Sequence, residues 1–478
     1  MEIIADLQLH SKYSRAVSPQ MTIPFIAEWA AKKGIGLVAT GDWTHPLWFR
    51  EIQHDLEELG NGLLGLKSEI RNPKSETNSK LEIQNSKFNN PLFLLATEVS
   101  SIYSQGGRSR RVHTLIWVPR LAAAEKINEA LRRRGCNLMS DGRPIIGLSC
   151  IEVADLVLNI ESKALIIPAH CWTPWYSVFG GMSGFDSLDE AFGKFSKNVY
   201  AVETGLSSNP AMNWRIKELD NRAILSFSDA HSGPKLGRET TVFQTRNNEQ
   251  KTMSNDKQIL TYDDIYGAIA EQSLGKNEGN LEIGYTVEFY PEEGKYHYSG
   301  HRNCGVSFGP KETVINKGIC PVCGRSLIQG VMQRVEELAS RPESDLQISD
   351  IRYQISDLNS DLRMIGSKAF PNRPPFAMLV PLLEIISEAI GSPVSSPKTI
   401  LIYDRLVQEL EGEFAVLLKS SIGEIARIGG ERVAEGVDKV RKGEIEIKPG
   451  YDGVFGKVKI WKEEALEKDN KEQLTLFG

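Results

Sequence analysis

Histidines and acidic residues recur directly after short apolar runs in the first half of the chain. His170 follows the run 166–169, for example, and Glu203 follows 200–202. If such runs are parallel strands of an α/β fold, their carboxyl ends converge on one face. Imidazoles and carboxylates gathered there suit Zn²⁺, Mn²⁺ or iron, and several metals together bind a phosphate, activate water and stabilise a leaving oxygen. The candidate residues are His10, Asp42, His45, Glu98, His113, His170, Glu203, Asp229 and His231.

The elements that must position these side chains alternate between strand and helix patterns. Helical periodicity covers segments such as 22–33 and 122–134. Buried strands are expected at 36–40, 92–97, 113–118, 164–169, 199–204 and 224–228. This alternation predicts an α/β fold with a largely parallel sheet or barrel for residues 1–285.

Four motifs in this region resemble those of the polymerase and histidinol phosphatase (PHP) superfamily. They are Asp-Leu-x-x-His-Ser at 6–11, a distal Glu, Pro-Ala-His at 168–170 and Ser-Asp-Ala-His at 228–231. The resemblance implies a distorted (β/α)7 barrel and a trinuclear centre of divalent metals, Zn²⁺, Mg²⁺ or Mn²⁺, for phosphoester hydrolysis. It implies as ligands His10, Glu98, His113, His170, Asp229 and His231, with Asp42 or His45 in the place of the second motif, and Glu203 fits the same strand-end pattern.

The first motif departs from the usual pattern of the superfamily. It usually reads His-x-His, and here Gln8 stands in the first position before Leu9 and His10. A glutamine carbonyl is a weaker metal ligand than an imidazole, so one metal position differs from the pattern.

A second cluster combines three cysteines with a histidine. His301 and Cys304 are followed, after fifteen residues, by Cys-Pro-Val-Cys-Gly at 320–324. This spacing is typical of a structural zinc ribbon in which histidine replaces one cysteine. The expected ligands of a structural Zn²⁺ are His301, Cys304, Cys320 and Cys323, with His297 as the rival fourth ligand.

Length and composition limit the classes of protein to which the chain can belong. The chain has 478 residues, of which 41% are hydrophobic and 25% charged, ordinary values for a globular protein of two or three domains. No apolar run approaches the roughly 18 residues of a membrane span, and the first six residues lack the basic region of a secretory signal. We therefore expect a cytoplasmic protein without membrane association, in which clustered cysteines bind metal.

Basic residues gather locally although the net charge is −6. The segment 108–143 carries nine Lys or Arg against three acids, which suits a phosphate backbone, with a solvated surface as the alternative. Aromatic residues follow His170 in a segment that ends in two glycines, and they suit stacking on bases, with a packed aromatic lid as the alternative. The candidate DNA contacts are Arg108, Arg110, Arg111, Trp172, Trp175 and Tyr176.

Changes of composition divide the chain into segments. A PHP-type catalytic barrel is expected at 1–285, interrupted at 67–91 by a polar stretch that we interpret as a flexible insertion. A zinc module at 286–340 precedes an inserted repeat or linker at 341–365, whose heptad spacing of apolar residues is compatible with a short amphipathic helix. A mainly helical DNA-binding region is expected at 366–462, and a loose tail at 463–478.

The tail ends in a short peptide that resembles the sliding-clamp binding peptide of bacteria. A glutamine and a leucine–phenylalanine pair on a free tail can dock into two adjacent pockets. The clamp-binding candidates are Gln473, Leu474, Leu476 and Phe477.

Taken in order along the chain, the motifs resemble the endonuclease Q family. These are the metal motifs, Gly-His-Arg-x-Cys at 300–304, Cys-Pro-Val-Cys-Gly at 320–324 and Gly-Tyr-Asp-Gly-Val-Phe-Gly at 450–456. The resemblance implies a DNA repair endonuclease that nicks duplex DNA on the 5′ side of deaminated bases (uracil, hypoxanthine, xanthine) or abasic sites and engages a sliding clamp. Two alternatives stay open: a small-molecule phosphoesterase, and a clamp-associated DNA adaptor whose metal site has decayed at Gln8.

Overall fold

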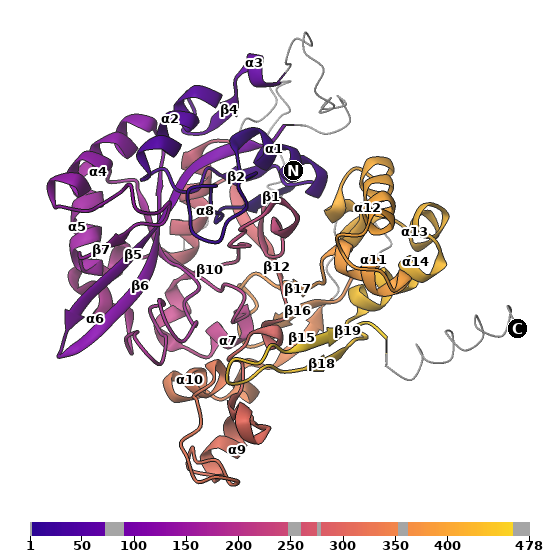
Figure 1. Cartoon of the computed structure of the whole chain (residues 1–478). Helices are drawn as coiled ribbons and strands as arrows, with labels where there is room; N and C mark the ends of the chain where they lie inside the picture. Colours follow the sequence, from indigo (N-terminus) through magenta and orange to yellow (C-terminus); the bar gives the residue numbers. More distant parts are fainter. Residues whose placement is uncertain (1, 72–89, 247–259, 275–278, 352–361, 462–478) are drawn as a thin grey trace, which may run out of the picture. The chain divides into compact units, whose positions relative to one another are not determined.

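The computed structural model describes residues 2–71, 90–246, 260–274, 279–351 and 362–461 (Figure 1). The chain divides into two compact units. The first unit comprises Met1–Glu288, Arg334–Ser349 and Ile365–Phe376. The second unit comprises Phe289–Gln333, Asp350–Met364 and Ala377–Gly478.

The first unit is a mixed α/β structure, which confirms the predicted fold class. The six strands expected from apolar runs all form. Their bounds differ from the expected ones, most of all at 92–97, where the strand continues to Gln105. Its strands are β1 (Glu2–Asp6), β2 (Leu37–Ala39), β3 (Leu56–Glu58), β4 (Leu64–Leu66), β5 (Leu92–Gln105), β6 (Arg108–Val118), β7 (Ile145–Ile146), β8 (Leu165–Pro168), β9 (Ala201–Glu203), β10 (Ala223–Leu225), β11 (Thr240–Thr245) and β12 (Leu281–Glu288). β15 (Ile348–Ile351), β16 (Met364–Ser367) and β17 (Phe376–Met378) extend the same sheet next to β12.

The sheet is mixed, which corrects the prediction of a largely parallel one. β1, β2 and β5 run parallel, as do β9 and β10 in a separate pair, but β11 lies antiparallel to β1, and β8 lies antiparallel to β6. β5 and β6 pair antiparallel along the whole of β6, from Leu95 opposite Val118 to Gln105 opposite Arg108, as the long ribbons in Figure 1 show. Gly106 and Gly107, with φ of 60° and 74°, close this hairpin in a conformation that glycine adopts without strain. Within the described part of the first unit, the hydrogen-bonded strands form an open sheet and a separate pair, not a closed ring.

The helices of this unit begin and end as the sequence signals predict. α5 starts at a capping box, in which Ser149 and Glu152 exchange hydrogen bonds between side chain and backbone. α1 ends at Gly34, whose φ of 83° forms the C-cap. The helices are α1 (Ile23–Lys33), α2 (Pro46–Asp55), α3 (Ser68–Arg71), α4 (Leu121–Arg133), α5 (Cys150–Ile160), α6 (Leu188–Phe192), α7 (Pro210–Trp214), α8 (Tyr262–Leu274) and, at the boundary between the units, α10 (Val331–Leu338). Most of the expected insertion at 67–91 lies outside the described residues, which end at α3 and resume at residue 90.

The second unit contains two small hairpins and a group of helices. His301 and Cys304 lie on the first hairpin, Cys320 and Cys323 lie in a turn after the following helix, and the last hairpin contains the Gly-rich motif. The elements are β13 (Ser299–His301), β14 (Val306–Phe308), α9 (Pro310–Ile315), α11 (Leu382–Ile390), α12 (Pro397–Glu409), a π-helical turn (Ala415–Lys419), α13 (Ile422–Gly429), α14 (Glu431–Lys442), β18 (Glu446–Lys448) and β19 (Lys457–Lys459).

A helical C-terminal region is therefore confirmed, and the expectation for the preceding repeat is corrected. α11 and α14 pack closely enough that a Cβ on Gly436 would lie 2.9 Å from a side-chain carbon of Ile385. Residues 348–351 form the strand β15 instead of the start of an amphipathic helix, because they pair with a neighbouring strand of the sheet. Residues 352–361 lie outside the described part of the chain.

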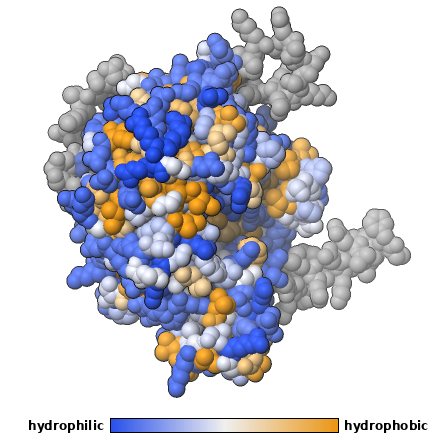
Figure 2. Space-filling model, turned by 60° about the vertical axis from the view of Figure 1, so that its left-hand side comes forward, coloured by the Kyte–Doolittle hydropathy of each residue, from blue (hydrophilic) through white to orange (hydrophobic). Residues whose placement is uncertain are grey.

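The surface is predominantly hydrophilic on the face drawn in Figure 2, where apolar side chains gather in separate groups. Within the described ranges, every helix is too short or too polar to cross a lipid bilayer.

Candidate metal centre

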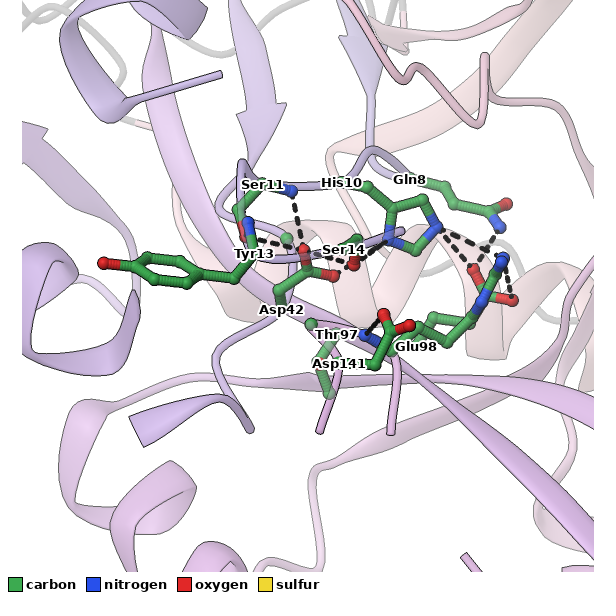
Figure 3. Close-up of polar contacts among 12 residues, drawn as sticks. Gln8, His10, Ser11, Tyr13, Ser14, Asp42, Thr97, Glu98 and Asp141 are labelled. Atoms are coloured by element: carbon green, nitrogen blue, oxygen red, sulfur yellow. Dashed lines mark hydrogen bonds and ion pairs between the residues drawn. The ribbon is translucent and has the colours of Figure 1, made fainter. Parts of the chain in front are cut away.

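Carboxylates flank His10 at both ring nitrogens. Nδ1 lies 2.9 Å from Oδ1 of Asp42, and Nε2 lies 3.1 Å from one oxygen of Glu98 and one of Asp229. Figure 3 shows His10 between Asp42 and Glu98. The backbone N–H of His10 donates to the carbonyl of Ala230 (3.0 Å), which joins the loop after β1 to the segment that carries Asp229. Since the ring is fully buried, these contacts fix its orientation.

Both carboxylate oxygens of Glu98 lie close to histidine or glutamine side chains. Oε2 lies 3.1 Å from Nε2 of His10 and accepts a hydrogen bond from Nε2 of Gln8 (3.0 Å). Oε1 lies 2.5 Å from Nδ1 of His113 and 3.3 Å from Nε2 of His170. One buried carboxylate therefore connects the N-terminal motif with the two later histidines.

Glu98 and His113 reach the site from the interior of strands. Both residues lie well inside β5 and β6, so the prediction that they border a strand end is wrong. His113 pairs with Ser100, two positions after Glu98. Because side chains alternate between the faces of a strand, this register places Glu98 and His113 on the same face.

His170 is held in an unusual backbone conformation. It follows β8 with a φ of 30°, and its N–H donates to Oε2 of Glu203 at the end of β9. A Cβ on Gly205 would lie 2.3 Å from that of His170, so the close approach requires glycine. Asp42 and Asp229 also have positive φ values, 45° and 47°. Strained non-glycine residues of this kind concentrate at functional sites.

Six of the predicted residues form two groups of potential metal ligands. Within each group the ligand atoms lie within 4.8 Å of one another. His231 packs edge-on against His10 with ring centroids 5.0 Å apart, and Glu98 lies next to both groups. The groups are His10, Asp229 and His231, and Glu98, His113 and His170.

Burial and neighbouring carboxylates set the charges of the site. Burial lowers the pKa of His113 to about 4, against the pull of Glu98, so its imidazole is neutral near pH 7. Burial also lowers the pKa of His10, but carboxylates, Asp42 foremost, outweigh it and raise that pKa well above its usual value. Burial raises the pKa of Glu203 well above its usual range.

The donor set fits divalent metals. Nδ1 of His113 and Nε2 of His170 lie 3.1 Å apart and both face the same oxygen of Glu98, an arrangement that a shared cation would satisfy. Two buried oxygens, Oε1 of Gln8 and Oε1 of Glu203, have no hydrogen-bond partner in the described part of the chain. Imidazole and carboxylate donors of this kind suit Zn²⁺, Mn²⁺ and iron.

Asp42 and His45, one of which is expected to be a ligand, lie outside the two groups, and Asp42 directly adjoins the first group through His10. The Asp42 oxygens accept from the backbone N–H and hydroxyl of Ser11 (2.6 and 2.7 Å), and Oδ1 lies beside His10. His45 caps α2 through Trp48 and stacks on Tyr13 with ring centroids 4.4 Å apart. Asp42 therefore orients His10, and His45 has a structural role.

Arg143 is a site residue that the sequence analysis counted only as part of a basic patch. Its Nη1 lies 3.3 Å from Oε1 of Glu98 and 3.4 Å from Nε2 of His10. Burial raises the pKa of Glu98, but Arg143 and His113 outweigh it and hold that pKa well below its usual range. In the sequence, Arg143 follows Asp141 and Gly142 after a helix, and no periodicity or ligand spacing distinguishes it there.

The Cys/His cluster also assembles as predicted. The ligand atoms of His301, Cys304, Cys320 and Cys323 lie within 4.8 Å of one another and could bind a metal. Burial raises the pKa of the Cys320 thiol, but the backbone N–H groups of Cys323 and Val322 outweigh it and lower the pKa to about 6. His297, the rival ligand, is buried outside this group.

Two of the predicted DNA contacts are interior residues, which corrects those assignments. Trp172 is fully buried, and its Nε1 donates to Asn213 (2.8 Å), so its ring offers no face to a base. Arg110 is buried too, where it bonds the carbonyl of Gly184 and pairs with Glu190.

The other predicted DNA contacts are accessible. Tyr176 is half-buried with its ring centroid 4.9 Å from that of His113, and the guanidinium of Arg111 lies 5.6 Å from the Tyr176 ring centroid. Arg108 is exposed and Trp175 is half-buried. The clamp-binding candidates Gln473, Leu474, Leu476 and Phe477 lie outside the described residues.

Two solved structures resemble the chain over nearly its whole length. One is the lesion-specific endonuclease PfuEndoQ from Pyrococcus furiosus, with 29% identity over 98% of this chain and 99% of that chain and a TM-score of 0.73. The other is an endonuclease Q in complex with a 27-mer duplex substrate that has an abasic lesion at the active site, with 30% identity over 97% of this chain and 98% of that chain and a TM-score of 0.72. The chain belongs to the endonuclease Q family.

Three further comparisons match smaller parts of this endonuclease Q family member. A sequence family described as the MJ0043 C-terminal domain matches residues 381–444, the region of α11 to α14. The MJ0043 protein of Methanocaldococcus jannaschii is 30% identical over 293 residues, which cover 60% of this chain but only 31% of that protein. The YqxK protein of Bacillus subtilis is 27% identical over 380 residues, which cover 78% of this chain and 80% of that protein.

Proposed function

We propose that this chain is a metal-dependent DNA repair endonuclease. It hydrolyses the phosphodiester on the 5′ side of a deaminated base (uracil, hypoxanthine or xanthine) or an abasic site in duplex DNA. The observation that carries this proposal is the pair of ligand groups joined by Glu98, in a chain whose solved relative binds a duplex with an abasic lesion. A small-molecule phosphoesterase would have no use for the second unit with its Cys/His cluster and helices.

The catalytic metals, Zn²⁺, Mg²⁺ or Mn²⁺, would be held by the two groups, with Gln8 and Glu203 as neighbouring oxygen donors. Divalent metals bound there would supply Lewis acidity toward the phosphodiester and would activate water. The Cys/His cluster would hold a structural Zn²⁺ on its four ligands. The PHP-type (β/α)7 barrel that the sequence motifs imply is the fold expected for such a centre.

The residues around the ligands orient them and receive the substrate. Asp42 holds the ring of His10, and Glu203 holds the backbone of His170. Arg143, whose side chain is 25% exposed, presents a guanidinium that can donate to a phosphate oxygen. Hydrolysis forms a bond from a water oxygen to phosphorus and breaks the bond to the 3′-oxygen, which leaves a 5′-phosphate on the lesion nucleotide.

The DNA would be bound largely by sequence-independent contacts. Exposed basic residues such as Arg108 would contact phosphates, and Tyr176 would lie beside an extruded nucleotide. A damaged or missing base lowers the cost of extrusion, which is one source of selectivity for lesions. The C-terminal peptide with Leu476 and Phe477 is proposed to dock on a sliding clamp.

Substitution of His170 tests the proposal. We expect His170→Ala to lower nicking of an abasic duplex by at least about 100-fold, because a ligand of the Glu98 group is lost. His113→Ala removes a second ligand at a position with ordinary strand backbone, so it serves as an independent variant. Nicking at the wild-type rate by both variants would contradict the site assignment.

A matched control separates loss of a ligand from loss of any histidine. The imidazole of His54 in α2 is 79% exposed and lies outside both ligand groups. His54→Ala should therefore nick at the wild-type rate. Circular dichroism and thermal unfolding of all three variants check that the fold is retained.

A further inference from the structure

An exposed aromatic side chain lies on the loop between β18 and β19. Phe455 is 65% exposed, and its neighbour Val454 is 40% exposed. Across the described ranges, every other Phe, Trp and Tyr is buried or half-buried. An isolated, fully presented aromatic ring on a loop tip favours a role in recognition over one in packing.

The loop that presents Phe455 is rigid. Tyr451 and Val454 exchange backbone hydrogen bonds of 3.0 and 2.8 Å across a turn in which Gly453 has a φ of 82°. Gly456 donates to the carbonyl of Glu293 (3.1 Å), and a Cβ on Gly456 would lie 2.0 Å from a neighbouring carbonyl oxygen. The backbone on both sides of Phe455 is therefore held in place before any partner arrives, which reduces the entropy lost on binding.

The Cys/His cluster supports this loop directly. Oδ2 of Asp452 accepts a hydrogen bond from the backbone N–H of Arg302 (2.7 Å), which lies between the potential ligands His301 and Cys304. The carbonyl of Gly450 accepts from the N–H of Tyr298 (2.9 Å) just before β13. The cluster therefore helps to position the exposed ring.

The surroundings of the ring are basic. Nζ of Lys295 lies 4.4 Å from the centroid of Phe455. Lys448, Lys457 and Lys459 lie on the two strands of the same hairpin. Of the two acids at 446–459, Asp452 accepts from the backbone N–H of Arg302, and Glu446 lies 3.9 Å from Nζ of Lys448. An exposed aromatic ring among lysines matches the stacking and charge requirements of a nucleic acid better than those of an apolar protein surface.

We propose that Phe455, with Val454 beside it, is a wedge that stacks against the bases of duplex DNA while Lys295 and Lys457 contact phosphates. This inference rests on the proposed function and adds to it a base-stacking residue in the second unit. Apolar side chains inserted at a base step unstack it partially. The wedge would therefore lower the cost of opening the duplex near a lesion.

The test measures DNA affinity without cleavage. A fluorescent duplex with one abasic site is titrated, without chelator, with full-length protein that carries His170→Ala to prevent cleavage, and anisotropy gives the Kd. We expect Phe455→Ala to raise the Kd by about 5- to 100-fold, and Phe455→Trp to restore it to within a few-fold of wild type. Leu59→Ala, which removes a 43% exposed apolar side chain between β3 and β4, is the control and should leave the Kd unchanged.

A base analogue distinguishes stacking from general adhesion. With 2-aminopurine beside the lesion, wild-type protein should increase the fluorescence as the base unstacks, and Phe455→Ala should lose most of this increase. Unchanged Kd and fluorescence in Phe455→Ala would overturn the inference and leave a protein partner as the occupant of the loop.

The experiments distinguish a failure of the proposed function from a failure of this inference. If the wild type binds DNA but nicks no lesion, the proposed function is overturned while the effect of Phe455→Ala on Kd still decides the wedge. If the wild type binds no DNA at all, both are overturned.

Discussion

Arg143 brings a permanent positive charge into a site that would also hold metals. Its Nη1 lies 3.3 Å from Oε1 of Glu98, the carboxylate next to both ligand groups. A cation in this position is favourable when an anionic substrate adds negative charge during the reaction. We therefore expect Arg143 to contact the scissile phosphate rather than to serve mainly in stabilising the fold.

We predict that Arg143→Ala lowers the single-turnover nicking rate by about 100-fold, the typical cost of one transition-state donor. Arg143→Lys should recover part of the loss, because it keeps the charge but not the planar fork of donors. Arg50→Ala, at an exposed position of α2 outside the basic segment 108–143, controls for the loss of a positive charge. An unchanged single-turnover rate in Arg143→Ala would show that the guanidinium has no role in the chemical step.

Glu288 is a buried carboxyl away from the metal centre whose titration should be visible in stability. Its Oε1 accepts from the hydroxyls of Ser226 (2.5 Å) and Thr286, and burial raises its pKa from 4.5 to about 7. The folded state therefore keeps a proton that the unfolded chain releases, so the free energy of unfolding falls as pH rises from about 4.5 through 7.

The loss attributable to Glu288 is about 3 kcal/mol once the pH exceeds 7. Glu288→Gln has no such proton, so its stability relative to wild type should improve by about this amount between pH 4.5 and 8.5. Urea unfolding of both proteins at a series of pH values measures the difference. A difference that stays constant with pH would contradict the assigned pKa.

At the scale of elements, the loop between α4 and α5 holds the site from one side. Gly142 donates its backbone N–H to Tyr13 (3.0 Å), and a Cβ there would lie 2.3 Å from both Oδ2 of Asp42 and the hydroxyl of Ser14. Glycine is required because the loop backbone approaches the residue that orients His10.

Gly142→Ala should therefore displace Asp42 and slow nicking by about 10- to 100-fold, since small misplacements of catalytic groups are costly. Gly147→Ala is the matched control on the same loop, because a Cβ there has no neighbour within 4 Å. Equal nicking rates in the two variants would show that the loop does not position Asp42.

The sequence predicts the elements of the first unit better than their arrangement. Apolar runs and helical periodicity located the strands and helices to within a few residues at most positions, because these signals are local. The hairpin of β5 and β6 reversed the expected direction of one strand, and it placed Glu98 and His113 inside strands. Strand partners are set by tertiary packing, which a single sequence does not encode locally.

The same limit applies to the site. His10, Glu98, His113, His170, Asp229 and His231 were predicted from their positions beside apolar runs and from the resemblance to PHP motifs, and the structure brings them together in two groups. Trp172 and Arg110 were predicted as DNA contacts, but both side chains are buried in the structure. Arg143 was missed as a site residue because a lone arginine in a loop carries no periodicity or metal-ligand spacing.

At the scale of the whole molecule, the residues proposed for chemistry and some of those proposed for DNA binding lie in different units. The first contains both metal-ligand groups, and the second contains the Cys/His cluster, the helices that match the MJ0043 C-terminal domain and the Phe455 loop. Resemblance to endonuclease Q structures over 97–98% of the chain includes both units. The account therefore predicts that chemistry depends on the first unit and DNA affinity partly on the second.

The central claim is tested most directly by nicking of defined duplexes. Labelled duplexes with one uracil, hypoxanthine or abasic site, and an undamaged control, are incubated with the purified protein and Mg²⁺ or Mn²⁺. The account predicts one nick, at the phosphodiester 5′ of the lesion, that is lost on chelation and in His170→Ala. Absence of a nick in every lesion duplex, or equal cleavage of the undamaged duplex, would contradict it.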